Sequence, residues 1–87
     1  MKYQRVTKIF AKKMNGKWYI LEPNKKIIRE LNEVGSFIWQ QLVKPRDINE
    51  VVNAICKEYR VDAKTAETDV RKFISEYVKD GYISEIS

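Results

Sequence analysis

The sequence predicts an α+β domain in which a three-stranded antiparallel sheet is followed by three helices. Residues 8–31 hold short segments rich in aromatic and β-branched residues, separated by turn residues, which is typical of strands. From residue 32 onward, apolar residues recur at helical spacing. With 87 residues, we expect one domain covering 1–87.

Three strands are expected in the first third of the chain. The segments 8–14 and 17–21 flank Asn15-Gly16, a pair suited to the positive φ angles of a two-residue hairpin turn. A second turn around Pro23 returns the chain as a third strand over 26–31. These segments predict a small antiparallel meander.

Three helices of increasing length are expected next. Asn32 is placed to cap the first helix, and Pro45 ends it. Asp47 with Glu50 forms a capping box for the second helix. Three short helices beside a small sheet resemble a winged-helix arrangement.

The third helix is expected to begin near Asp62 or Thr65 and to end at Gly81, a residue that readily adopts the left-handed conformation. Residues 82–86 alternate in polarity, so they form either a short last strand or a docked tail.

Composition excludes several classes of function. The chain has no histidine and one cysteine, Cys56, which removes histidine-dependent catalysis, thiolate metal sites and internal disulfides. Its three glycines are too scattered for a phosphate-binding loop. We expect no signal peptide and no membrane span, and therefore a cytoplasmic protein. No cofactor, metal or catalytic residue is predicted.

The net charge of +5 is unevenly distributed. Residues 1–29 hold nine basic groups and one acidic group, whereas the remainder holds eight basic and eleven acidic groups. A basic protein with a winged-helix arrangement suggests DNA binding, but the expected helices interleave acidic with basic residues and offer no basic face. A DNA-binding winged-helix regulator is therefore kept as the alternative function.

Several segments resemble PqqD-like proteins, which are also called RiPP recognition elements because they bind the leaders of ribosomally made, modified peptides. The similar segments are LNEVGSFIWQQL at 31–42, the strand-turn-strand ILEPNKKIIRELNEVG before and into it, RDINEVVNAICKEYRVD and AETDVRKFISEYVKDGYI. They follow the family order over about residues 17–83. No single motif among them is specific, whereas the ordered set is.

The resemblance implies a non-catalytic, stand-alone protein that binds a precursor's leader peptide by strand addition. The leader would lie on the sheet edge, between the third strand and the third helix. Implied partners are the leader peptide and a modifying enzyme such as a leader protease or a radical SAM protein. Among the pathways that use this fold, the lasso-peptide and radical-SAM systems are favoured.

The expected leader-binding residues lie on the edge strand and on the facing helix: Lys25, Lys26, Ile27, Ile28, Arg29, Glu30, Leu31, Val70, Phe73, Ile74 and Tyr77. The basic members would suit acidic leaders. The helical members also fit a plain core stripe, from which the Tyr77 hydroxyl would still seek water or a partner.

Two further interpretations stay open. An adaptor that joins two proteins is hard to separate from a leader-binding protein, whereas an enzyme lacks any nucleophile-base pair in this sequence. The same exposed edge also allows a homodimer.

Overall fold

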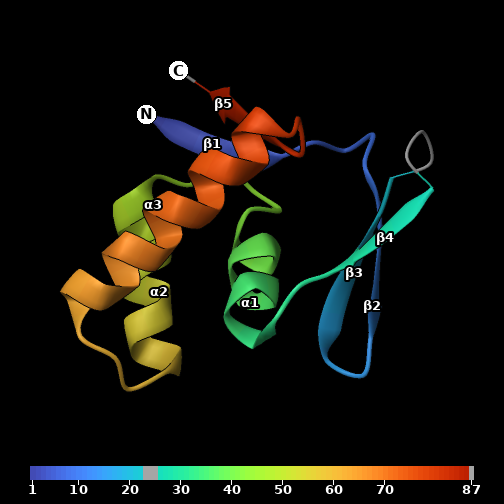
Figure 1. The fold of residues 1–87 in the computed structure, drawn as a ribbon. Helices are drawn as coiled ribbons and strands as arrows, with labels where there is room; N and C mark the ends of the chain where they lie inside the picture. Colours follow the sequence, from blue (N-terminus) through green and yellow to red (C-terminus); the bar gives the residue numbers. More distant parts are fainter. Residues whose placement is uncertain (23–25, 87) are drawn as a thin grey trace.

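The computed structural model describes residues 1–22 and 26–86. Its elements, in chain order, are β1 (Lys2–Arg5), β2 (Phe10–Met14), β3 (Lys17–Glu22), β4 (Ile27–Glu30), α1 (Glu33–Gln41), α2 (Ile48–Glu58), α3 (Ala63–Lys79) and β5 (Ile83–Ile86) (Figure 1). The expected α+β class is confirmed: a three-stranded antiparallel sheet precedes three helices of increasing length.

The main sheet has the strand order β2-β3-β4, and both pairings are antiparallel. Met14 pairs directly with Lys17, so Asn15 and Gly16 form the expected two-residue turn. Their φ angles are 53° and 81°. These positive angles match the twist of the flanking strands. Lys26 also has a positive φ and lies outside β4, which is therefore shorter than the expected strand over 26–31.

All three helices begin at the capping residues that the sequence indicates. The side chains of Asn32, Asp47 and Asp62 each accept a hydrogen bond from a backbone N–H in the first turn. The capping box of Asp47 with Glu50 is complete in both directions. The chain leaves α3 through Gly81, whose φ of 85° confirms the predicted left-handed exit.

The strand pair β1–β5 joins the two ends of the chain (Figure 1). The segment 82–86 contains the strand β5 (Ile83–Ile86), one of its two expected forms, but its partner β1 was not predicted. The sequence KYQR of β1 has little apolar character, and its extended form depends on pairing with β5 and on backbone bonds to Leu42 and Arg46, all distant in sequence.

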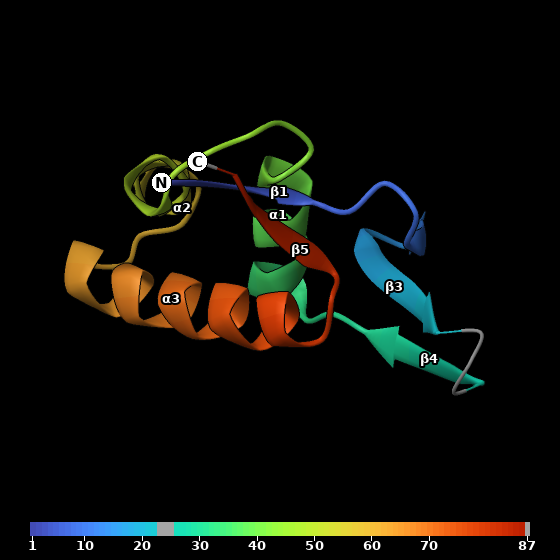
Figure 2. The same cartoon turned by 90° about the horizontal axis from the view of Figure 1, so that it is seen from above.

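Helix α1 lies between the sheet and the other two helices, as the view from above shows (Figure 2). The largest fully buried side chains come from the sheet and all three helices: Trp39, Ile20, Ile38, Leu42, Val51 and Val70. An ion pair of 3.0 Å between Arg29 and Asp80 joins β4 to the end of α3. Within residues 1–22 and 26–86, no helix is long and apolar enough to cross a membrane.

Candidate functional site

Strand β4 forms an open edge of the main sheet. The backbone N–H of Leu31 bonds to the carbonyl oxygen of Trp18 on the β3 side, at 2.9 Å. Because alternate residues of an antiparallel strand direct their N–H groups the same way, Arg29 also faces β3. The N–H and C=O groups of Ile28 and Glu30 therefore point outward, where another strand can bond to them.

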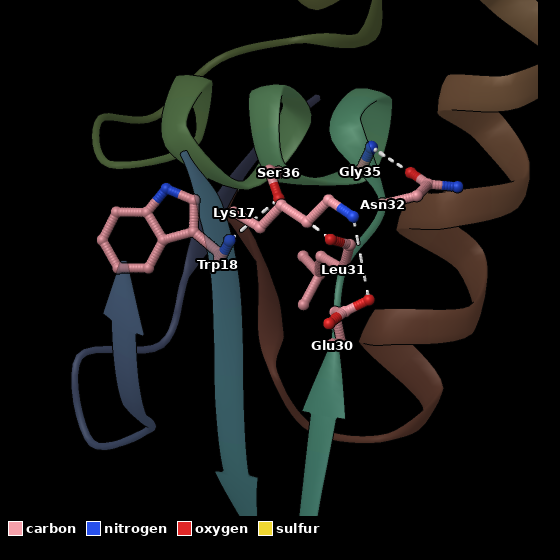
Figure 3. Close-up of polar contacts among 7 residues, drawn as sticks. All are labelled: Lys17, Trp18, Glu30, Leu31, Asn32, Gly35 and Ser36. Carbon is pink, nitrogen blue, oxygen red and sulfur yellow. Dashed lines mark hydrogen bonds and ion pairs between the residues drawn. The ribbon is translucent and has the colours of Figure 1, made fainter. Parts of the chain in front are cut away.

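The end of this edge is fastened to the first turn of α1 by Ser36 (Figure 3). The buried hydroxyl of Ser36 accepts a bond of 2.9 Å from the Trp18 N–H and donates one of 3.2 Å to the Leu31 carbonyl. It takes the place of the direct bond that would close the β3–β4 ladder here. The junction fixes the direction in which the chain leaves the sheet after β4.

A cavity of about 280 Å³ opens between α1 and α3, next to this junction. Its walls combine apolar and charged side chains, contributed by Asn32, Val34, Gly35, Ile38, Asp69, Lys72, Phe73 and Glu76. Gly35 keeps the space open, because a Cβ atom there would lie 3.2 Å from Cε2 of Phe73. The cavity can therefore receive an apolar side chain from a peptide that extends along β4.

Arg29 is held by groups of this chain. Its guanidinium lies 5.4 Å from the ring centre of Tyr77 and 5.3 Å from that of Tyr82, and it forms ion pairs with Asp80 and Glu22 at 3.0 and 3.9 Å. Its charge is thus largely compensated, although the sequence suggested that it would face an acidic ligand. Burial raises the pKa of the Tyr77 hydroxyl, so this group stays protonated at neutral pH.

The structure divides the expected site residues into three groups. Val70, Ile74, Tyr77 and Leu31 are buried in the core, whereas Phe73 is partly buried and reaches the cavity. The side chains of Lys26, Ile27, Ile28 and Glu30 are exposed, and that of Arg29 is partly covered. Lys25 lies outside the described residues.

Seven cavity residues were missed as site residues: Asn32, Val34, Gly35, Ile38, Asp69, Lys72 and Glu76. The last three share one face of α3 with Phe73, at spacings of three and four residues. That periodicity was present in the sequence, where the interleaved acidic and basic residues of this helix counted only against a basic face for DNA. With two carboxylates and one ammonium group, this wall has no strong preference for an acidic ligand. No cluster of three or more metal-binding side chains occurs in the part of the chain that the structure describes.

Comparisons with known proteins agree with this geometry. Residues 17–83 match the model of a family described as coenzyme PQQ synthesis protein D (PqqD). A solved structure described as TbiB1 in complex with the TbiA(beta) leader peptide is similar, with 26% identity, a TM-score of 0.83 and coverage of 97% of this chain and 98% of that one.

A second structure, described as lasso peptide synthetase B1 complexed with the leader peptide, has the same fold. It shares 18% identity and a TM-score of 0.81, over 98% of this chain and all of that one. No curated protein matches the chain.

Proposed function

The chain belongs to the PqqD family, and from this premise we propose that it binds the leader segment of a ribosomally synthesised precursor peptide. The observation that carries the proposal is the open edge of β4, from which the chain continues to Asn32 in the wall of the cavity between α1 and α3. The likeness to a protein solved in complex with a leader peptide supports it. The chain acts as a binding protein and leaves the chemistry to an enzyme.

Binding proceeds by strand addition. The leader bonds to the outward N–H and C=O groups of Ile28 and Glu30, which gives affinity with little sequence preference. Selectivity comes from side chains on alternate leader residues, one of which enters the cavity lined by Phe73 and Gly35. Val70, Ile74 and Tyr77 support this wall from inside the core.

The bound leader brings its attached core peptide to the modifying enzyme. Tethering raises the effective concentration of the core peptide at that enzyme without new contacts to the core itself. The enzyme is a leader protease or a radical SAM protein, as in lasso-peptide and related pathways. Cys56 is a free thiol, as is usual in reducing compartments, and we place the exchange in the cytoplasm.

The outer face of the sheet is the proposed contact surface for that enzyme. Phe10, Leu21 and Ile28 pair directly across the three strands and form an apolar row, in which Phe10 is 62% exposed and Ile28 is 66% exposed. Large exposed apolar side chains in one row are typical of interaction surfaces. Because the row ends on β4, an enzyme on this face would lie next to the bound leader.

The proposal is tested by replacing Ile28 with proline. Proline removes the outward N–H at the centre of the edge but no bond of the β3–β4 ladder, so the fold is expected to persist. Leader affinity should fall at least about tenfold, as the loss of one main-chain bond and the distorted edge imply. The measurement is fluorescence anisotropy of a labelled leader peptide from a precursor encoded beside this protein.

Two variants control for this change. Ile28→Ala shortens the exposed side chain but keeps the N–H, and Lys13→Pro places proline on the opposite edge, β2; both should bind the leader as the natural protein does. Duplex DNA is titrated in parallel. Tight DNA binding without leader binding would favour the alternative function, a DNA-binding winged-helix regulator. If Ile28→Pro and the natural protein bind the leader with equal affinity, β4 is excluded as the docking edge.

A further inference from the structure

A second cavity, also of about 280 Å³, lies apart from the β4 edge. It is formed by the β1–β2 connection, β2, β3 and the end of α1, and the lining residues are Arg5, Val6, Thr7, Ile9, Ala11, Trp18, Trp39 and Val43. No lining residue is shared with the cavity between α1 and α3. Figure 3 shows the Trp18 indole projecting away from Leu31 and Glu30, and Trp18 is one of the residues that line the second cavity.

Arg5 lies between the two tryptophans of the chain. Its guanidinium carbon is 5.1 Å from the ring centre of Trp18 and 5.6 Å from that of Trp39. Both distances allow cation–π attraction, which offsets part of the cost of burying the charge. The rings therefore hold the guanidinium in place at the cavity wall.

Three buried N–H donors without an acceptor belong to residues that line this cavity. They are Nη1 of Arg5 and the indole Nε1 atoms of Trp18 and Trp39, and none meets a hydrogen-bond partner among residues 1–22 and 26–86. Trp39 is only 1% exposed. Such donors are costly to leave unpaired, so three of them around one cavity indicate a ligand that only accepts hydrogen bonds.

The charge around the cavity favours an anion. Residues 1–21 contain six lysine or arginine residues and no acidic residue, and no carboxylate lines the cavity. Desolvation by burial lowers the pKa of the Arg5 guanidinium, which reflects a cation without a carboxylate partner at close range. Val6, Ile9, Ala11 and Val43 supply apolar walls, and Thr7 adds a hydroxyl group.

We propose that Arg5, Trp18 and Trp39 form a binding site for a carboxylate carried on a short apolar stem. The carboxylate oxygens would accept bonds from the guanidinium and the indole N–H groups, while the stem contacts the aliphatic walls. A hydrophilic oxyanion such as phosphate would leave those walls without a partner. The carboxylate belongs either to a free small acid or to the C-terminus of a protein chain.

Tryptophan emission reports on this site directly, because both tryptophans of the chain flank Arg5. The full chain is titrated with butyrate and, separately, with butyramide at constant ionic strength. Butyrate should change the emission and reach saturation at millimolar concentrations, whereas butyramide, which lacks the charge, should not. The second pair of probes is a tripeptide that ends in leucine and is blocked at its N-terminus. One form has a free C-terminus and the other an amidated C-terminus.

The affinities for butyrate and for the tripeptide with a free C-terminus are then compared. A difference of at least about tenfold identifies the source of the carboxylate. Arg5→Gln should weaken the preferred carboxylate at least about tenfold, since it removes a charge-assisted bond. Lys8→Gln removes a neighbouring charge outside the cavity lining and should change the affinity by less than about twofold.

Trp39→Phe and Trp18→Phe each remove one N–H and keep an aromatic ring, and each should weaken carboxylate binding severalfold. These two variants test the site if Arg5→Gln does not fold. Equal responses to acid and amide, or equal losses in Lys8→Gln and Arg5→Gln, would overturn the proposal. Leader binding at β4 is measured separately, so either site can fail without the other.

Discussion

At the point where the sheet meets the helices, the side chain of Ser36 takes the place of a backbone–backbone hydrogen bond. It is 4% exposed, and its hydroxyl serves both the Trp18 N–H and the Leu31 carbonyl. A hydroxyl can do this because it donates one bond and accepts others. Since Leu31 directly follows β4 and Gly35 adjoins Ser36, this one residue controls how the open edge is aligned with the cavity beside α3.

Replacing Ser36 with alanine leaves the buried Trp18 N–H and Leu31 carbonyl without these bonds. The free energy of unfolding should fall by roughly 1 to 3 kcal/mol, the usual cost of an unsatisfied buried polar group. Ser75→Ala, at an exposed position of α3, should change it by less than about 0.5 kcal/mol. Urea denaturation measures both, and equal values for the two variants would contradict the role assigned to Ser36.

At the scale of elements, the main sheet has two open edges, and they differ in the helix that lies nearby. The β4 edge leads to Asn32, which lines the cavity between α1 and α3 together with Phe73, and Phe73 stacks on Tyr77 with ring centres 4.1 Å apart. Strand β2 forms the other edge. A peptide added to β4 gains main-chain bonds and apolar burial together, whereas one added to β2 gains the bonds and lacks the α3 wall.

A comparison of Phe73→Ala with Phe37→Ala distinguishes a loss of protein stability from a loss of leader affinity. Both phenylalanines are partly buried and contact a tyrosine ring, but Phe37 contacts Tyr59 at 5.5 Å and does not line the cavity beside β4. Each variant should lose roughly 1 to 3 kcal/mol of unfolding free energy, less than a fully buried phenylalanine would.

Only Phe73→Ala should weaken leader binding, by at least about tenfold, because a leader side chain loses its apolar wall. Anisotropy titrations at a temperature where both variants are folded make the comparison. A similar loss of affinity in Phe37→Ala would show that the effect comes from general destabilisation.

At the scale of the molecule, the two ends of the chain complete the core together. Ile83 in β5 is 2% exposed and pairs with Arg5 in β1, and the Val6 N–H bonds to the Tyr82 carbonyl at 2.9 Å. The terminal pair therefore connects α3, which walls the proposed leader groove, to Arg5 of the proposed carboxylate site. Loosening either end should lower the stability of the whole.

Ile83→Ala leaves a cavity beneath β1–β5 and should cost about 2 to 5 kcal/mol of unfolding free energy. Val78→Ala removes an apolar side chain that is 37% exposed on α3 and should cost less than about 1 kcal/mol. Thermal and urea unfolding of the full chain provide the comparison. Equal small losses would show that the terminal pair frays without affecting the core.

Features that depend on neighbours in sequence were predictable. The Asn15-Gly16 turn, the caps at Asn32 and Asp47 and the exit at Gly81 are all present, because each depends on the backbone preferences of a few adjacent residues. The periodicity of α3 likewise predicted its apolar face, and the resemblance indicated which strand is the open edge. The sequence by itself thus determined the order of the elements from β2 to α3, and the family.

Features that depend on residues far apart in sequence were decided by tertiary structure alone. The ion pair of Arg29 with Asp80 holds this expected leader-binding side chain against the end of α3. The close approach of Phe73 to Gly35 shaped the cavity, and Trp18 and Trp39 converged on Arg5. No local propensity encodes these contacts; they arise when separate elements bury their apolar faces in one core, which brings polar groups together at its margins.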